Sequence, residues 1–381
     1  MQINEFKKQF NQNSPYIHLN NSGQAPIPEV NRLKAFEWLD RFYSEGAVCS
    51  GAGWNQVESV RVQLAQFIGA ETEEIAFFQT TASALSQAAL SIPLSPGDQI
   101  LTWQQEYPSN FYPWRLAAER SGAKIIQIPS ENYETPYEKI LEKVNKRTKV
   151  VTVSWVQYQT GSVTDLKEIS NVLKDRGIWL VADIIQGAGV RSFNFADSGF
   201  DIVCCGSHKW LCSSYGAAFM AVRRERLTEL QPLEVGAMTY GDPDTVKSFS
   251  IPTKTNASKF EPGSKSMIEI IALGETLRLF QSVGLSNIEQ EALRLAGVLR
   301  SGLSEMGFDI CKPHDGVILN VSAQAKTAAD DRVAKNKIIA AELKQQKISF
   351  GLRGPGLRLS VHAFNTDEEI SKTLAVFRKF I

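Results

Sequence analysis

Two neighbouring stretches, IWLVADIIQGAG at Ile178–Gly189 and DIVCCGSHKWL at Asp201–Leu211, carry the strongest structural signal in this chain. Each contains a short apolar run with several β-branched residues, which is typical of a buried strand. The first run ends at Asp183, with Gln186 three residues later, and the second is followed by Lys209. Polar side chains therefore follow directly on two strands that we expect to be buried.

The region around these stretches alternates short apolar runs with longer amphipathic ones. Strand, helix, strand in series predicts an α/β fold with a mostly parallel sheet, here of seven strands, covered by helices on both faces. The expected strands are Ile75–Phe78, Gln99–Trp103, Lys124–Ile128, Val150–Trp155, Ile178–Ala182, Asp201–Cys205 and Ala217–Val222, and the expected helices include Pro28–Ser44, Gln56–Ile68, Ala84–Leu90, Pro113–Ser121 and Leu166–Asp175. Ligands bind such sheets at the carboxyl ends of strands, where Asp183 and Lys209 are found.

The C-terminal part predicts a smaller α+β domain. Helices are expected at Met267–Val283, Leu285–Met306, Asp331–Gln346 and Thr366–Phe380, with strands at Gly316–Ser322 and Leu357–Val361. Thr366 is the expected N-cap of the last helix, and Glu369 completes a capping box. We expect a large domain over residues 20–265 and a small one from residues 1–19 and 266–381, with 266–283 as the linking helix. Residues 241–264 are rich in turn formers and predict an extended loop.

Bulk composition narrows the class of protein. The chain has 41 Lys+Arg and 41 Asp+Glu, and a formal net charge of zero gives no reason to expect nucleic acid or an anionic membrane as partner. The five cysteines are odd in number and form no CxxC pair, which argues against a disulfide framework and a zinc site. No signal-peptide pattern and no apolar run near the roughly 20 residues of a membrane span are present, so we expect a cytoplasmic protein.

Lys209, Asp183 and Gln186 together match the requirements of one cofactor, pyridoxal phosphate. A lysine amine can bind its aldehyde covalently, and a buried carboxylate can pair with its pyridine nitrogen and keep that nitrogen protonated. Gln186 can donate a hydrogen bond to its phenolate oxygen. Taken singly, each residue has an ordinary explanation, as a surface lysine, a turn aspartate or a loop glutamine. Their combination at two successive strand ends favours the cofactor site.

Weaker signals lie elsewhere along the expected strand ends. Thr81 and Ala82 open a helix whose free N–H groups and hydroxyls suit the cofactor phosphate, although threonine-rich helix starts are usually plain N-caps. His208 can donate to the same phosphate, with a satisfied core histidine as the alternative. Tyr107 follows another strand and can stack on the pyridine ring, or it can simply pack.

A carboxylate anchor is predicted near the C-terminus. Arg358 presents a bidentate fork that suits a substrate carboxylate, and Arg353, in the preceding turn, is a second candidate. An arginine on an exposed strand face is the commoner case. Position alone therefore leaves both explanations open.

These residues resemble the class V aminotransferases, a family that also includes cysteine desulfurases, cysteine and selenocysteine lyases, kynureninase and isopenicillin N epimerase. The resemblance is carried by Asp183, two residues, Gln186, and His208-Lys209 on the next strand. It implies the fold of pyridoxal phosphate-dependent transferases of fold type I. By matching position, Lys209 is the cofactor lysine, Asp183 the pyridine-nitrogen partner and Gln186 the phenolate partner.

The resemblance also implies roles for the weaker candidates. Thr81, the Ala82 amide and His208 match phosphate ligands. Tyr107 matches the ring-stacking residue, and Arg358 matches the residue that binds the substrate α-carboxylate.

Three further positions rest on the resemblance alone. Residues 260–264, FEPGS, are similar to a loop that reaches across a homodimer, where Ser264 would contact the phosphate of the other subunit. Residues 16–22, YIHLNNS, are similar to the segment that lines the substrate pocket, which implies a substrate contact for Asn21. Trp155 occupies a position that the family often fills with Asn or His and is a third candidate contact.

The reaction branch is predicted from departures from the family pattern. Cysteine desulfurases carry a nucleophilic cysteine on the loop before the carboxylate-binding arginine, whereas residues 347–356 hold none. Tyr107 stands where they have histidine, and Gly206 replaces a hydroxyl residue three positions before Lys209. We therefore expect transamination of a small α-amino acid, with β-elimination at cysteine or selenocysteine second and epimerisation third. A non-catalytic scaffold and an NAD-binding domain are weaker alternatives, the latter because no GxGxxG follows the early strands.

Overall fold

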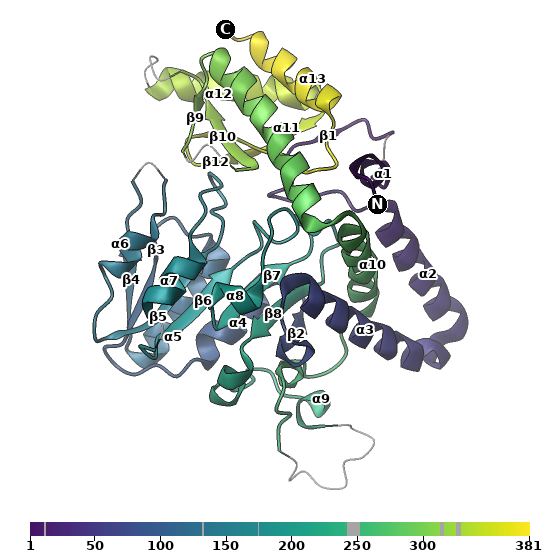
Figure 1. Ribbon diagram of the computed structural model, residues 1–381, viewed down its shortest axis with the longest axis vertical. Coiled ribbons are helices and arrows are strands. Elements are labelled where there is room, and N and C mark those ends of the chain that lie inside the picture. Colours follow the sequence, from purple (N-terminus) through teal and green to yellow (C-terminus); the bar gives the residue numbers. More distant parts are fainter. Residues whose placement is uncertain (11–12, 132, 174, 242–251, 313–315, 325–328) are drawn as a thin grey trace.

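The computed structural model describes residues 1–10, 13–131, 133–173, 175–241, 252–312, 316–324 and 329–381 (Figure 1). Its main sheet has seven strands in the order β2-β8-β7-β6-β5-β3-β4. They are β2 (Ile75–Phe78), β3 (Gln99–Trp103), β4 (Lys124–Ile128), β5 (Thr148–Ser154), β6 (Trp179–Asp183), β7 (Ile202–Gly206) and β8 (Ala218–Val222). Of these strands, β8 runs in the opposite direction to the other six, so the predicted mostly parallel α/β fold is confirmed.

Alternate side chains of each strand build two apolar layers, one on each face of this sheet. In β7, Ile202 and Cys204 join the layer covered by α4 (Thr81–Ser91) and α5 (Tyr112–Ser121). Val203 and Cys205 join the opposite layer, to which α3 (Ser50–Ile68), α7 (Leu166–Leu173), α8 (Phe195–Ser198) and α10 (Met267–Val283) contribute. Short α6 (Tyr137–Leu141) and α9 (Ala237–Tyr240) lie in connections.

A second sheet lies in the C-terminal part, shown above the main sheet in Figure 1. It is antiparallel in the order β12-β13-β10-β9, with bounds Gly351–Arg353, Gly356–Ser360, Ile318–Ser322 and Asp309–Ile310. Its helices are α11 (Leu285–Glu305), α12 (Ala329–Gln345) and α13 (Asp367–Arg378). The predicted capping box of α13 is confirmed, because Thr366 Oγ1 accepts from the Glu369 amide at 3.2 Å and Glu369 Oε2 accepts from the Thr366 amide at 2.9 Å.

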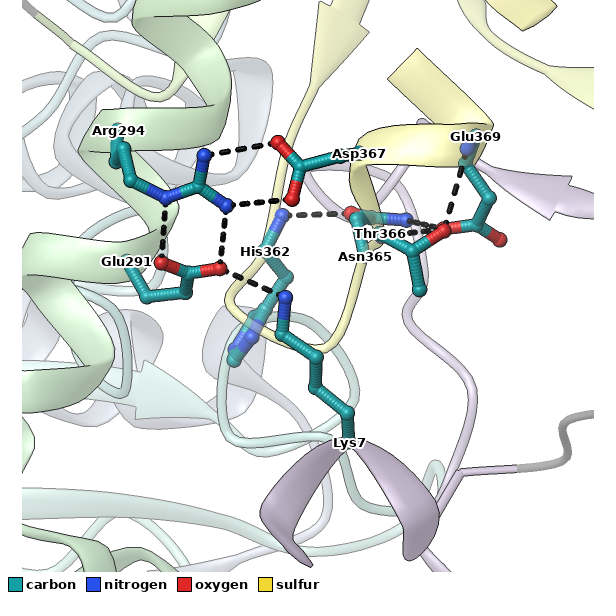
Figure 2. A network of polar contacts seen from close by, with 8 residues as sticks. All are labelled: Lys7, Glu291, Arg294, His362, Asn365, Thr366, Asp367 and Glu369. Carbon is teal, nitrogen blue, oxygen red and sulfur yellow. Dashed lines mark hydrogen bonds and ion pairs between the residues drawn. The ribbon is translucent and has the colours of Figure 1, made fainter. Parts of the chain in front are cut away.

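The N-terminal residues contact this C-terminal part. The short β1 (Ile17–His18) pairs in parallel with β11 (Ile348–Ser349). Lys7, on α1 (Ile3–Lys8), forms an ion pair with Glu291 of α11 at 2.7 Å (Figure 2). The proposed division into two domains remains a prediction.

The start of one helix differs from the prediction, and part of one predicted loop lies outside the described residues. Helix α3 begins at Ser50, six residues before the expected start at Gln56. The prediction placed the start too late because the glycines in the first turn of the helix interrupt the hydrophobic pattern. Gly53 packs closely against α10, since a Cβ atom there would lie 2.2 Å from the Met267 sulfur and would displace the Met267 side chain. Of the predicted loop 241–264, residues 242–251 lie outside the described part of the chain.

The topology brings several strand ends to one edge. Because β2 is antiparallel to β8 and β8 is antiparallel to β7, β2 runs in the same direction as β7. The carboxyl ends of β2, β3, β5, β6 and β7 therefore share one edge of the sheet. Within the described residues, no helix is both long and apolar enough to cross a bilayer.

Candidate active site

A cavity of about 310 Å³ lies at this carboxyl edge. Eight of the predicted site residues line it: Thr81, Ala82, Tyr107, Asp183, Gln186, His208, Lys209 and Arg358. The second arginine candidate, Arg353, lines it too. Ser22, the last residue of the segment 16–22 that was expected to line the substrate pocket, lines it as well. Residues without a predicted role complete the lining: Gly23, Thr80, Ser109, Tyr158, Ile185 and Tyr215.

Asp183 and Lys209 form the charged centre of the cavity. Asp183 is the last residue of β6, is 4% exposed, and its Oδ1 accepts one hydrogen bond, from the Ile185 amide at 2.9 Å. Burial raises the pKa of Asp183 to about 6. Burial also lowers the pKa of Lys209 to about 8, although the charge of Asp183 opposes this shift. A carboxylate and an amine are thus held out of water with few partners of their own.

Aromatic rings and an amide frame this pair. The Lys209 Nζ lies 5.5 Å from the centroid of the Tyr107 ring. Gln186 is fixed at both ends of its amide, because its Oε1 accepts from Trp210 Nε1 at 2.9 Å and its Nε2 donates to the Ser22 carbonyl at 3.0 Å. These contacts hold Gln186 at the wall of the cavity beside Lys209.

The N-terminus of α4 forms one corner of the cavity. Thr80 is the N-cap, and its Oγ1 accepts from the Ser83 amide at 3.0 Å, which leaves Thr81 without a capping role. The Thr81 hydroxyl is buried and has no hydrogen-bond partner. A free hydroxyl beside exposed amides at a helix start suits a phosphate. Gly206 belongs to the same corner, since a Cβ atom there would lie 2.7 Å from Thr81 Oγ1.

His208 stands at the same corner and stacks on Tyr215, with ring centroids 4.5 Å apart. Burial lowers the pKa of His208 to about 4, so the imidazole is neutral near pH 7. A neutral imidazole still carries one N–H group that can donate to a phosphate oxygen.

Arg358 enters the cavity from β13 of the second sheet. Contrary to the common case of an exposed strand arginine, it is 2% exposed. Its Nη1 donates to the Tyr158 carbonyl at 2.7 Å and its Nη2 to Asn20 Oδ1 at 3.2 Å, while Nε is buried without a partner. Burial, reinforced by the charge of Arg353, lowers the pKa of Arg358 to about 10. A desolvated guanidinium with a free donor is suited to an anionic ligand.

Three predicted site residues do not line this cavity, and their roles remain predictions. Asn21 is buried behind the wall, where its Nδ2 donates to the Ser360 carbonyl at 2.8 Å. The Trp155 ring packs on Phe193 with centroids 5.0 Å apart. Ser264 lines a separate cavity of about 380 Å³.

Sequence reasoning missed Glu106, a buried carboxylate between two strand-end loops. It accepts hydrogen bonds from the Ser154 amide at 2.7 Å and from Asn110 and Gln157 at 3.1 Å each. These bonds tie the loop after β3 to the loop after β5. The rule that sites gather at strand ends pointed to both loops, but the residue pattern did not indicate which side chains meet.

Comparison with known proteins identifies the family of this chain. The sequence profile of the Aminotransferase class-V family matches residues 37–372. The uncharacterized aminotransferase YcbU of Bacillus subtilis is 24% identical, with 86% of each chain covered. A protein named probable cysteine desulfurase from Methanothermobacter thermautotrophicus is also 24% identical, over 93% of this chain and 92% of its own length.

The solved structures show the same fold. The apo structure of a cysteine desulfurase from Thermococcus onnurineus superposes with a TM-score of 0.87, at 23% identity, over 99% of this chain and 98% of its own. The family profile extends over most of the chain, including every residue that lines the charged centre of the cavity. The protein therefore belongs to the class V aminotransferase family and is a pyridoxal phosphate-dependent transferase or lyase.

Proposed function

We propose that this enzyme transaminates a small α-amino acid, with pyridoxal phosphate held in the cavity at the carboxyl edge of the main sheet. The observation that carries the proposal is the convergence of Lys209, Asp183 and Arg358 on that cavity. They supply an amine for the aldehyde, a carboxylate for the pyridine nitrogen and a guanidinium for the substrate carboxylate.

The residues present fit the cofactor. The partnerless Thr81 hydroxyl, the Ala82 amide and the neutral His208 would hold the phosphate. Asp183, buried with a single hydrogen bond, would face the pyridine nitrogen. When bound, pyridoxal phosphate accepts the electron pair released at the substrate α-carbon.

The chain's own residues would then move a proton. A pKa of about 8 leaves part of the Lys209 amine neutral near pH 7.5, so Nζ can accept the proton from the substrate α-carbon. Arg358, fixed by the Tyr158 carbonyl and Asn20, would hold the carboxylate and so orient the Cα–H bond toward Nζ. The atom to which the proton is returned decides between transamination and epimerisation.

The cysteines argue against the persulfide route. None of the five, all of which the structure describes, lines the cavity. Cys204, Cys205 and Cys212 are fully buried, and burial raises the pKa of each thiol well above its ordinary value. β-Elimination at cysteine stays the second candidate, because it needs a leaving group on the substrate but no enzyme thiol, and several relatives carry the name cysteine desulfurase.

One experiment separates these reactions. The enzyme saturated with pyridoxal phosphate is mixed with single amino acids, without any keto acid, and its visible spectrum is followed. Transamination predicts loss of the absorbance of the lysine-bound aldehyde, with one equivalent of keto acid released per subunit. Continuous release of pyruvate and sulfide from cysteine, with that absorbance persisting, would instead establish the lyase.

We further propose that the protein is a homodimer and that α2 (Glu29–Glu45) forms part of the interface. This helix lies at the outside of the molecule in Figure 1. The exposed apolar residues at the helical spacing of one face of α2 are Leu33, Phe36, Leu39 and Tyr43, with exposed fractions of 53%, 52%, 49% and 94%. A second copy of the chain would cover this face and bring its Ser264 toward the neighbouring site. Sedimentation of the wild type and of Phe36→Glu tests it, since a monomeric wild type contradicts the proposal.

We also propose that the protein is cytoplasmic. All five cysteines are unpaired, which suits a reducing compartment. Fractionation of cells that express the tagged protein tests this assignment, and recovery in a membrane or secreted fraction contradicts it.

A further inference from the structure

The hairpin that carries the carboxylate anchor repeats its own sequence. Gly351-Leu352-Arg353 and Gly356-Leu357-Arg358 flank the turn Gly354-Pro355. In the strand register, Arg358 pairs with Gly351 and Arg353 pairs with Gly356. Arg353 and Arg358 are therefore diagonal neighbours on one face of the hairpin, a placement that separates such residues by about 7–8 Å.

A glycine lies opposite each arginine in the strand register. A Cβ atom at Gly351 would lie 3.3 Å from Nε and Nη2 of Arg358 and from Asn20 Oδ1, so a larger residue there would crowd the guanidinium and its hydrogen bond to Asn20. The corresponding partner of Arg353 is also a glycine. The lack of a side chain at Gly351 thus allows the Arg358 guanidinium to lie in the wall of the cavity.

The two arginines give the cavity a surplus of positive charge. Arg353, Arg358 and Lys209 line it, whereas Asp183 is the only carboxylate in its lining among the residues that the structure describes. Among the described residues, no carboxylate pairs with either arginine, and the side chain of Arg353 bonds only to its neighbour, the Leu352 carbonyl, at 2.8 Å. Asp183 is matched to the pyridine nitrogen, so both guanidinium groups remain for the substrate. The α-carboxylate of a substrate satisfies one of them.

We infer that Arg353 binds a second acidic group on the substrate, so that the preferred substrates are α-amino acids with a carboxylate side chain, aspartate or glutamate. This inference rests on the proposed function, because it takes Arg358 as the anchor of the α-carboxylate. The buried Arg358 holds the group next to the reacting carbon, and the exposed Arg353 holds the group that lies nearer the solvent.

Binding of unreactive acids tests the inference without turnover. Succinate and butyrate have the same number of carbons but two and one carboxylates, and each is titrated calorimetrically into the enzyme saturated with pyridoxal phosphate. We expect succinate, or the longer glutarate, to bind about tenfold more tightly than butyrate, as a charge-assisted hydrogen bond would give. Arg353→Gln should remove most of this difference, and Arg378→Gln, an exposed arginine of the same part of the chain, should leave it intact.

Two outcomes overturn the inference. Equal binding of succinate and butyrate to the wild type would show that Arg353 recognises no second acid. Equal weakening of both ligands by Arg353→Gln would show that Arg353 instead shares the α-carboxylate with Arg358.

Reaction rates then separate this inference from the proposed function. Aspartate against asparagine and glutamate against glutamine differ only in the charge of the side chain, and the wild type should convert the charged member of at least one pair about tenfold faster at low concentration. Conversion of alanine with no preference in either pair would overturn the inference and leave transamination standing. Binding of succinate that depends on Arg353, without conversion of any amino acid, would support the second acid site and overturn the proposed function.

Discussion

Two groups of buried charges in this protein differ in how they are satisfied. The first lies under β2, where Arg61 and Glu261 are each 3% exposed and meet in a two-pronged ion pair at 2.6 and 2.9 Å. Glu261 also accepts from the Phe77 amide at 2.7 Å and pairs with Lys265 at 2.8 Å. Arg61 donates in addition to the Ile75 carbonyl at 2.8 Å. Both charged groups find their partners within the chain.

The second group is the candidate active site, where the charges have no such partners. Asp183 accepts one backbone hydrogen bond, and Arg358 donates only to neutral oxygens. The contrast shows in one residue type: the carboxylates of Glu261 and Glu58 raise the pKa of Arg61 above its ordinary value despite burial, whereas burial lowers that of Arg358 to about 10. Buried charges that are satisfied internally depend on each other, because removal of one partner leaves the other uncompensated, and those that are left unsatisfied are available to ligands.

The largest expected effect comes from removing the amine at the centre of the second group. Lys209→Ala should lower turnover by about 10⁴-fold or more, because both the covalent anchor and the proton acceptor are lost. The stability of the cofactor-free protein should not fall, since a desolvated amine is removed. Keto acid release and thermal unfolding are measured together, with Lys209→Arg as a control that keeps the charge. Retained turnover in Lys209→Ala would show that Lys209 is neither the cofactor lysine nor the proton acceptor.

In the Arg61–Glu261 group, loss of one partner should instead lower the free energy of unfolding. Glu261→Gln leaves the Arg61 guanidinium buried without its counter-charge, and we expect a loss of about 3–5 kcal/mol in the free energy of unfolding. Glu58→Gln is the matched control, because Glu58 pairs with the same arginine at 2.8 Å but is 57% exposed. Its loss should be below about 1 kcal/mol in urea titrations. Similar losses in the two variants would contradict the distinction.

Replacement of Asp183 in the cofactor-free protein should change the free energy of unfolding in the opposite direction to the replacement of Glu261. Its folded pKa of about 6 lies above the ordinary 3.8, so the folded state binds the proton more tightly and stability falls as pH rises from about 4 to 6. Asp183→Asn removes this penalty. We expect it to raise the free energy of unfolding on the order of 1–3 kcal/mol at pH 7.5, with no gain below about pH 4.

Thermal unfolding of both proteins, freed of cofactor, across this pH range measures the effect of Asp183→Asn. The same variant should lose activity. A variant that is less stable at pH 7.5, or a difference that does not change with pH, would show that Asp183 is satisfied within the chain.

Much of this second group was predictable from the sequence because it depends on local patterns and strand order. The apolar runs ending at Asp183 and before Lys209 predict two buried strands, and adjacent parallel strands place their carboxyl ends together. The structure pairs Asp183 with Cys204 across β6 and β7. The capping box at Thr366 is local for the same reason, since its bonds span three residues.

What the sequence did not predict depends on contacts between distant segments. The burial of Arg358 is set by Tyr158 and Asn20, residues 200 and 338 positions away along the chain. Glu106 is recognisable as a structural carboxylate only once the loops after β3 and β5 are side by side. Hydrophobic periodicity carries no information about such pairs.

The smallest expected effect concerns a third kind of charge, paired but exposed. Arg294 of α11 bonds to Glu291 at 2.8 Å and to both oxygens of Asp367 at 2.8 Å each, as Figure 2 shows, yet it is 47% exposed. Its hydrogen bond lowers the pKa of Asp367, so the stabilisation is present near neutral pH and is lost as pH falls through the folded pKa. Water and salt screen such pairs, and Arg294→Gln should lower the free energy of unfolding by less than about 1 kcal/mol at pH 7.

Urea titrations of Arg294→Gln at low and high salt measure this effect, and the small loss should shrink further as salt rises. The comparison with Arg61 is then direct, because both arginines hold two carboxylates in the folded chain and differ in exposure. A loss in Arg294→Gln as large as that in Glu261→Gln would mean that the number of bonds, and not burial, sets the energy of these ion pairs. In that case the unpaired state of Asp183 and Arg358 would no longer distinguish a ligand site from ordinary surface charge.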